Sequence, residues 1–190
     1  MKQCLPYRPC VGIALFNAYG QVFLGERIDT PNAWQMPQGG IDPDEIVEEA
    51  ALRELEEETG TRNVSILEAA PESLCYDLPQ HLLGKLWGGQ FCGQEQYWVA
   101  ARFEGSDEDI DLKFHEWPEF RAWSWTDFPQ ILDLIVPFKR DVYAQVMTWF
   151  EKYSDPKEVR HAEPMDWDQN GPSALDKGSD KHSKKAAARI

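Results

Sequence analysis

Four glutamates crowd the last turns of a predicted helix, directly before Gly60. Glu54, Glu57 and Glu58 stand at i, i+3 and i+4, which brings three like charges onto one helical face. The C-terminal end of a helix favours cations, so the helix dipole adds a second repulsion to that between the carboxylates, each of about several tenths of a kcal/mol. A solvated acidic face is the alternative interpretation of such a cluster.

A bound divalent cation would reverse both repulsions. Hard cations such as Mg²⁺ take oxygen ligands and are commonly shared between a few carboxylates and the phosphates of a substrate. The type and spacing of these glutamates therefore predict a site where a metal ion meets a phosphate.

The helix that must position these carboxylates is delimited by its own sequence. Asp42 is expected to cap it, with Pro43 in the first helical position and Glu45 completing a capping box. Gly60 is expected to end it. An apolar stripe predicts packing against a sheet, and it comprises Ile46, Val47, Ala50, Ala51 and Leu55.

The rest of the chain predicts a mixed α/β architecture. Residues 11–26 read as a β-hairpin around the turn-forming sequence NAYG. Further strands are expected at 64–70, 72–78, 96–103 and 120–125, and helices at 128–136 and 138–153. This order predicts a mixed sheet with helices packed on it.

The 190 residues predict one core-forming domain and an appendage. With 42% hydrophobic and 27% charged residues, the composition is that of a packed globular protein and excludes a membrane protein. We expect a cytoplasmic domain over residues 1–153 and a flexible tail over 154–190, where no apolar periodicity is visible. The four cysteines have no metal-ligand spacing and are expected to be reduced.

The spacing of the acidic helix and the glycines around it resembles the signature of a known family. Residues from Gly39 to Gly60 fit the pattern G-x5-E-x7-R-E-U-x-E-E-x-G of the Nudix hydrolases, in which U is aliphatic. Thr61 is the one departure, because the family pattern usually ends in an aliphatic residue. The resemblance implies an α/β/α sandwich with a mixed sheet and a catalytic loop-helix-loop segment.

The resemblance also implies a role for each matched position. Glu54, Glu57 and Glu58 are expected to bind Mg²⁺ or Mn²⁺, with Glu57 as the leading ligand or base. Arg53 is expected to orient carboxylates, and Glu45 to hold the loop at the start of the helix. Gly39 and Gly40 are expected to let the backbone approach the metal closely.

Segments outside this pattern are similar to the bacterial RNA 5′-pyrophosphohydrolases and to the related asymmetric dinucleoside polyphosphate hydrolases. They lie in order over residues 6–150 and read YRPCVGIALFN, WQMPQGG, YDLP, GQEQYW, PEFRAWSW and FKRDVY. In those relatives a glutamate in the segment PEF joins the metal site. It corresponds to Glu119, with Glu116 as the weaker alternative.

The same segments imply substrate contacts, each of which has an ordinary structural alternative. Arg8 is expected to pair with a phosphate and Lys139 to contact a phosphate or a base. Phe138 and Tyr76 are candidates for stacking on a nucleobase, although either can simply belong to the core. Two cleft-facing amides are also expected, and they are Gln94 and Gln96.

Three functions remain open at this point. The first is hydrolysis of the 5′-triphosphate end of RNA with release of pyrophosphate. The second is cleavage of dinucleoside polyphosphates, for which Tyr76 and Trp87 would wall a second adenosine pocket. The third is a non-catalytic nucleotide-binding module, which the intact charged positions disfavour. The formal net charge of −14 leaves no basic stripe for a long nucleic acid, so RNA would be held only at its end.

Overall fold

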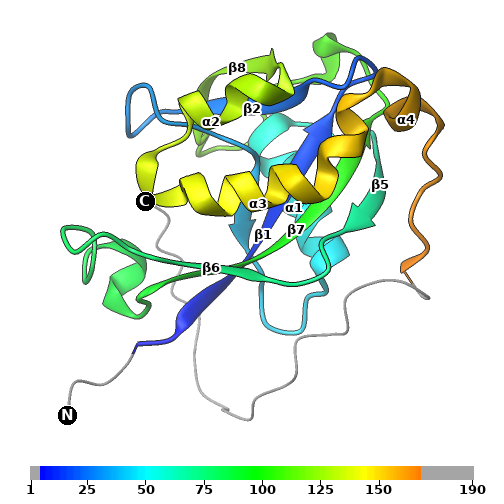
Figure 1. The fold of residues 1–190 in the computed structure, drawn as a ribbon. Helices are drawn as coiled ribbons and strands as arrows, with labels where there is room; N and C mark the ends of the chain where they lie inside the picture. The colour runs from blue at the N-terminus through cyan, green and yellow to red at the C-terminus, as the bar shows by residue number, and fades with distance from the viewer. Residues whose placement is uncertain (1–4, 168–190) are drawn as a thin grey trace.

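The computed structural model of the chain describes residues 5–167. An eight-stranded sheet forms its centre, with strand order β3-β2-β1-β7-β5 and with β4, β6 and β8 paired to β1, β7 and β2 (Figure 1). The strands are β1 (Tyr7–Phe16), β2 (Val22–Arg27), β3 (Trp34–Gln35), β4 (Gln38–Gly40), β5 (Val64–Ala69), β6 (Leu74–Asp77), β7 (Gly93–Phe103) and β8 (Phe120–Thr126).

The sheet is mixed, as the sequence predicts. β1 and β7 run parallel along their whole length, from the pair Tyr7 and Gly93 to the pair Phe16 and Arg102. All other pairings between the named strands are antiparallel. The predicted hairpin between β1 and β2 reduces to one pair beside the turn, Phe16 with Val22, because β4 takes the other part of that edge of β1.

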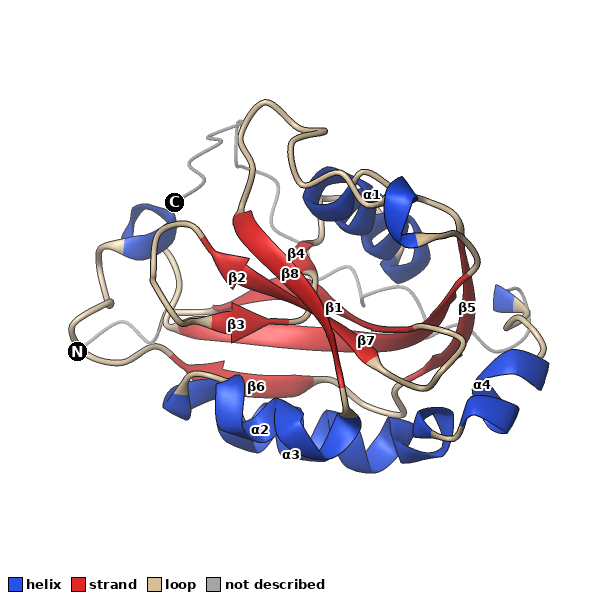
Figure 2. Ribbon diagram, turned by 90° about the horizontal axis from the view of Figure 1, so that it is seen from above, coloured by secondary structure: helices blue, strands red, loops and turns tan. Residues whose placement is uncertain are grey.

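Helices cover both faces of the sheet and give an α/β/α sandwich (Figure 2). α1 (Val47–Thr59) lies on one face, and α2 (Ile131–Leu134) and α3 (Arg140–Phe150) lie on the other. Short 3-10 helices complete the chain at Leu86–Gly89, Asp107–Asp109, Phe128–Gln130, Pro137–Lys139 and Glu151–Ser154, followed by α4 (Pro156–His161). Within the described part of the chain, no helix is long and apolar enough to cross a membrane.

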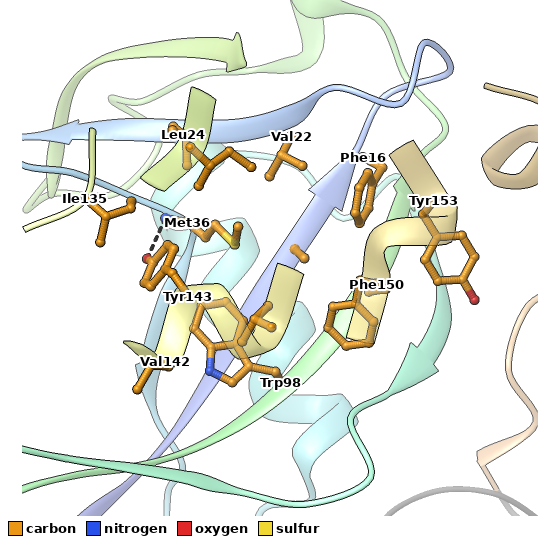
Figure 3. Close-up of a cluster of buried hydrophobic side chains, with 14 of the residues drawn as sticks. Phe16, Val22, Leu24, Met36, Trp98, Ile135, Val142, Tyr143, Phe150 and Tyr153 are labelled. Carbon is orange, nitrogen blue, oxygen red and sulfur yellow. Dashed lines mark hydrogen bonds between the residues drawn. The ribbon is translucent and has the colours of Figure 1, made fainter. Parts of the chain in front are cut away.

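Two hydrophobic cores follow from the alternation of side chains along β1. Val11, Ile13 and Leu15 point to the face that α1 covers, where they meet Ala50 and Leu55. The side chains between them point to the opposite face, where α3 packs. Figure 3 shows this second core, which includes Phe16, Trp98, Tyr143 and Phe150. The backbone nitrogen of Met36 donates a hydrogen bond to the hydroxyl oxygen of Tyr143 there (3.0 Å).

The acidic helix α1 begins later than its sequence predicts. α1 starts at Val47 rather than after Asp42, because Asp44 takes a left-handed backbone conformation (φ 71°) that a helix cannot contain. The Glu45 side chain still accepts a hydrogen bond from the Asp42 nitrogen (2.9 Å), so the predicted contact closes a turn instead of capping a helix. Ile46 consequently leaves the apolar stripe and is 43% exposed. Gly60 ends the helix in the left-handed conformation, as predicted.

The predicted start of the tail at residue 154 is wrong. α4 follows directly, and its Val159 is fully buried in the core of the α3 face. Arg102 donates from Nη1 to the carbonyl oxygens of Val159 and Ala162, and the Met165 nitrogen donates to the Ile66 oxygen of β5 (2.8 Å). This segment docks through backbone groups and through the scattered apolar side chains of Val159, Ala162 and Trp167, which leave no periodic pattern in the sequence. The part of the predicted tail from 168 to 190 lies outside the described residues.

Candidate active site

A cleft of about 330 Å³ opens beside the C-terminal half of α1. Strands β1, β2, β4, β6 and β7, the loop from β6 to β7 and the turn before α3 contribute side chains to it. Its lining contains most of the residues that the sequence singles out, namely Arg8, Gly39, Gly40, Glu54, Tyr76, Gln94, Glu119, Phe138 and Lys139.

Arg53 ties α1 to the loop before it. Its guanidinium holds both carboxylate oxygens of Glu45 at 2.8 Å and the carbonyl oxygen of Gly40 at 2.7 Å. From Nη1 it also donates to Glu54 at 2.7 Å and approaches Glu57 at 3.5 Å. Although partial burial opposes ionisation of Glu45, these hydrogen bonds lower its pKa. One guanidinium, that of Arg53, therefore holds both the loop before α1 and two acidic side chains of α1 in place.

The Glu54 carboxylate fills the space that a side chain at position 39 would need, so only glycine fits there. A Cβ at this position would lie 1.9 Å from the Glu54 carboxylate. The carboxylate itself is buried, and burial raises its pKa against the attraction of Arg53, with Glu57 and Glu119 adding to the rise. The close approach of backbone and carboxylate thus depends on glycine.

The charged form of Glu58 is strongly disfavoured by its surroundings. It is 3% exposed, and burial raises its pKa well above the usual value, with further repulsion from Glu119 and Glu54. Its Oε2 accepts a hydrogen bond from the Gln38 nitrogen (3.0 Å), whereas its Oε1 has no hydrogen-bond partner in the described chain. A buried carboxylate oxygen without a donor is costly unless a further group meets it.

These carboxylates have the donor chemistry of a site for a hard divalent cation. Besides burial, Glu119 and Glu54 raise the pKa of Glu58, and Glu57 and Glu119 raise the pKa of Glu54; a cation among these groups would reverse the repulsion. Within residues 5–167, no three acidic, histidine or cysteine side chains are yet gathered closely enough to hold an ion. Instead Arg53 holds two of the glutamates, as described above.

The structure distinguishes between the two candidates for the additional glutamate. Glu119 lines the cleft, and its backbone oxygen accepts a hydrogen bond from Ile28 (2.9 Å) at the start of β8. Glu116 is exposed and does not line the cleft. The observed geometry therefore favours Glu119.

Lys139 lies buried at the base of the cleft. Its ammonium donates to the side-chain oxygens of Gln38 (3.1 Å) and Gln35 (3.3 Å). Burial and the charge of Arg27 lower its pKa to about 8. Because these amide partners are neutral, they do not cancel the charge of the Lys139 ammonium, which can still attract an anion in the cleft.

Two aromatic rings form one wall. Tyr76 and Phe138 lie 5.7 Å apart between ring centroids, and the Lys139 ammonium lies 5.8 Å from the Tyr76 ring. Tyr76 is 9% exposed and donates from its hydroxyl to the Gln94 side chain (2.6 Å), while Phe138 is 37% exposed. Tyr76 thus belongs to the core and to the cleft wall at once, and Phe138 has the freer ring face.

One predicted cleft residue lies elsewhere. Gln96 is fully buried and does not line the cleft, because its side chain turns inward to hydrogen-bond Gln38 and Gln94. Conversely, the sequence interpretation missed Arg27, Gln35, Gln38 and His81, which all line the cleft. The first three lie on β2, β3 and β4, so only strand pairing brings them to the carboxylates. The one sequence signal for Gln35 and Gln38 was the matched segment WQMPQGG, which contains neither Arg27 nor His81.

Comparison with known proteins agrees with this architecture. The model of a family described as NUDIX domain matches residues 6–146. RNA pyrophosphohydrolases from Rhodospirillum rubrum and Novosphingobium aromaticivorans are each 55% identical to the chain, over 80% and 77% of its length and 92% and 93% of theirs. Among solved structures, the dihydroneopterin triphosphate pyrophosphohydrolase of E. coli has a similar fold, with a TM-score of 0.59 and 19% identity over 74% of this chain and 96% of that one.

Proposed function

The chain belongs to the NUDIX domain family, and from this premise we propose that it hydrolyses the 5′-triphosphate end of RNA. The products would be pyrophosphate and RNA with a 5′-monophosphate. The observation that carries the proposal is that Glu54 and Glu119, which both raise the pKa of the buried Glu58, line a cleft together with the cations Arg8, Arg27 and Lys139. The names of relatives at 49–55% identity support the RNA end as substrate.

NUDIX hydrolases generally depend on divalent metals, and we propose that Glu54, Glu57, Glu58 and Glu119 hold Mg²⁺ or Mn²⁺ in this chain. The ion would supply charge neutralisation at the phosphate oxygens and a more acidic water. The chain's own contribution is positional. Arg53 aligns the carboxylates of Glu54 and Glu57, and Gly39 leaves the space that Glu54 occupies.

The substrate's other groups would meet the remaining walls. Arg8 and Lys139 would contact phosphate oxygens, and Phe138 would stack on a nucleobase beside Tyr76. Gln94 would stay in place beneath them through the hydroxyl of Tyr76. An enzyme that acts on RNA ends works where RNA is, so we also propose a cytoplasmic location.

The test compares two substrates under identical conditions. The purified chain is given Mg²⁺ and either a short 5′-triphosphorylated RNA or diadenosine tetraphosphate, and kcat/KM is measured for each. We expect pyrophosphate and 5′-monophosphorylated RNA from the first substrate, at a kcat/KM at least equal to that for the second. A hundredfold preference for the dinucleotide would overturn the proposal in favour of dinucleoside polyphosphate hydrolysis.

A further inference from the structure

Arg8 differs from the two other cations that line the cleft. Arg27 donates from Nε to Asp29 (2.7 Å), and Lys139 donates to two glutamines. Arg8 forms no salt bridge with any residue between 5 and 167. Because a guanidinium presents donors in a rigid fork that matches phosphate oxygens, an unpaired arginine in this cleft is ready for an anion.

Two neighbours restrict where the Arg8 guanidinium can lie. On the side of the catalytic segment, a Cβ on Gly40 would come within 2.3 Å of its Nη2. On the other side, its Cζ lies 5.4 Å from the centroid of the Trp87 ring. Trp87 also lines the cleft. The guanidinium therefore occupies a gap between the catalytic segment and the loop from β6 to β7.

That loop brings Trp87 to Arg8 by an unusual backbone. Figure 1 shows it extending beyond the sheet at the end where β1 begins, and Cys92 anchors it there by donating from its nitrogen to the Pro6 oxygen (3.0 Å). Trp87 has φ 50° and ψ 37°, a left-handed conformation that bulky residues rarely adopt, and the next two residues, Gly88 and Gly89, also have positive φ. Such conformations cluster at functional sites because only specific contacts maintain them.

The contact with the Trp87 ring leaves Arg8 able to bind a phosphate. An aromatic face attracts the flat surface of a guanidinium, whereas the N–H donors point outward in its plane. A carboxylate partner would occupy those donors and cancel the charge. An indole does neither, so it can hold the orientation of the fork without competing with an anionic ligand.

We propose that Trp87 is a positioning residue that acts through Arg8, holding the guanidinium plane so that its edge faces a phosphate of the substrate. The inference rests on the proposed function, which assigns Arg8 to a phosphate. It assigns no nucleobase contact to Trp87, in contrast to the adenosine pocket that the sequence suggests for this residue.

A double-mutant cycle tests the coupling. The variants R8A, W87A and R8A/W87A are compared by kcat/KM on a 5′-triphosphorylated RNA. We expect W87A to lose about 3- to 30-fold, mainly through KM, and R8A to lose more. The double variant should match R8A within about twofold, because Trp87 has no effect once Arg8 is gone. Losses that multiply in the double variant would overturn the proposal.

Three further variants separate positioning from loss of fold. W87F keeps an aromatic face and should recover most of the lost activity, whereas W87L keeps apolar bulk alone and should behave like W87A. Leu83→Ala is the matched loop control, because Leu83 is 39% exposed in the same loop and does not line the cleft. It should retain wild-type kcat/KM. If W87L were as active as W87F, stacking would not be the cause.

The affinity for inorganic pyrophosphate can be measured without turnover, and this ligand contains no nucleobase. Calorimetric titration should show that the affinity for pyrophosphate falls in W87A and falls further in R8A, and W87F should bind like the wild type. Unchanged pyrophosphate affinity in W87A, together with weakened RNA binding, would mean that Trp87 stacks on a base and would refute the proposal. Because this measurement does not involve RNA hydrolysis, it stays decisive even if the proposed function fails.

Discussion

Replacement of Glu58 by glutamine should stabilise the metal-free protein while it removes activity. In the wild type, the buried Glu58 carboxylate faces Glu119 and Glu54, and its Oε1 has no donor among the described residues. In Glu58→Gln, the amide oxygen can still accept from the Gln38 nitrogen, and the new NH₂ group can donate toward Glu119. One repulsion and one unsatisfied atom thus become a hydrogen bond.

The expected gain in stability follows from replacing a buried, unsatisfied carboxylate by a hydrogen-bonded amide. Satisfying a buried polar atom and removing a buried charge should add about 1–3 kcal/mol to the free energy of unfolding. At ~2–4 °C per kcal/mol for a chain of this size, the melting temperature in EDTA should rise by about 2–12 °C. With saturating Mg²⁺ the wild type gains stability by binding the ion and the variant gains less, so the difference should shrink or reverse.

The pH dependence has a definite sign. Because the folded-state pKa of Glu58 is raised, the stability linked to this group is present below the unfolded pKa and is lost as pH rises through the folded pKa. The advantage of Glu58→Gln in EDTA should therefore grow with pH over that range and vanish in acid. The wild type at low pH carries a protonated, neutral Glu58 much as the variant carries an amide.

The assay is thermal unfolding of the wild type, Glu58→Gln and the control Glu56→Gln, with EDTA or Mg²⁺, beside kcat on triphosphorylated RNA. Glu56 lies on the same helix but pairs with Arg62 at 3.0 Å, so its variant should be slightly less stable and fully active. Glu58→Gln should lose at least ~100-fold in kcat. A lower melting temperature in EDTA, or more than about a tenth of wild-type activity, would refute the reasoning.

Three more outcomes are expected. Glu57→Gln should fold normally and lose at least ~100-fold in kcat, and retention of a tenth of the activity would remove Glu57 from the metal site. KM for triphosphorylated RNA should rise as pH increases through about 8, where Lys139 loses its charge, and this rise should be weaker in Lys139→Arg; an unchanged profile would exclude Lys139 from phosphate binding. A chain ending at Tyr153 should melt at least ~3 °C below one ending at Trp167, because burial of Val159 alone is worth ~1.5–3 kcal/mol; equal melting temperatures would show that α4 adds nothing.

The acidic part of the site was predictable because it is local. Glu54, Glu57 and Glu58 share one helix, so their spacing alone places them on one face, and Gly60 marks the end of that helix. The start of the same helix was not predictable, since Asp42 and Pro43 look like a cap until the left-handed Asp44 interrupts the turn.

The opposite wall of the cleft depends on pairing between strands. Gln35 reaches the site because β3 pairs with β2, and Gln38 because β4 pairs with β1. Strands of two and three residues carry no alternation that a sequence pattern can reveal. Gln96 illustrates the reverse error: its neighbour Gln94 lines the cleft, and only the inward hydrogen bond to Gln38 shows that Gln96 does not.

The unfavourable end of α1 can now be understood electrostatically. The helix places carboxylates where its own dipole repels them, and the fold meets this cost with Arg53, whose Nη1 lies 2.7 Å from Glu54 and 3.5 Å from Glu57. Arg53 does not relieve Glu58, which keeps an oxygen without a donor and a raised pKa. The Arg53 guanidinium thus stabilises Glu54 and Glu57 and leaves the buried carboxylate of Glu58 unsatisfied. Since an unsatisfied buried carboxylate gains most from a cation, Glu58 is where ion binding should contribute most to stability as well as to catalysis.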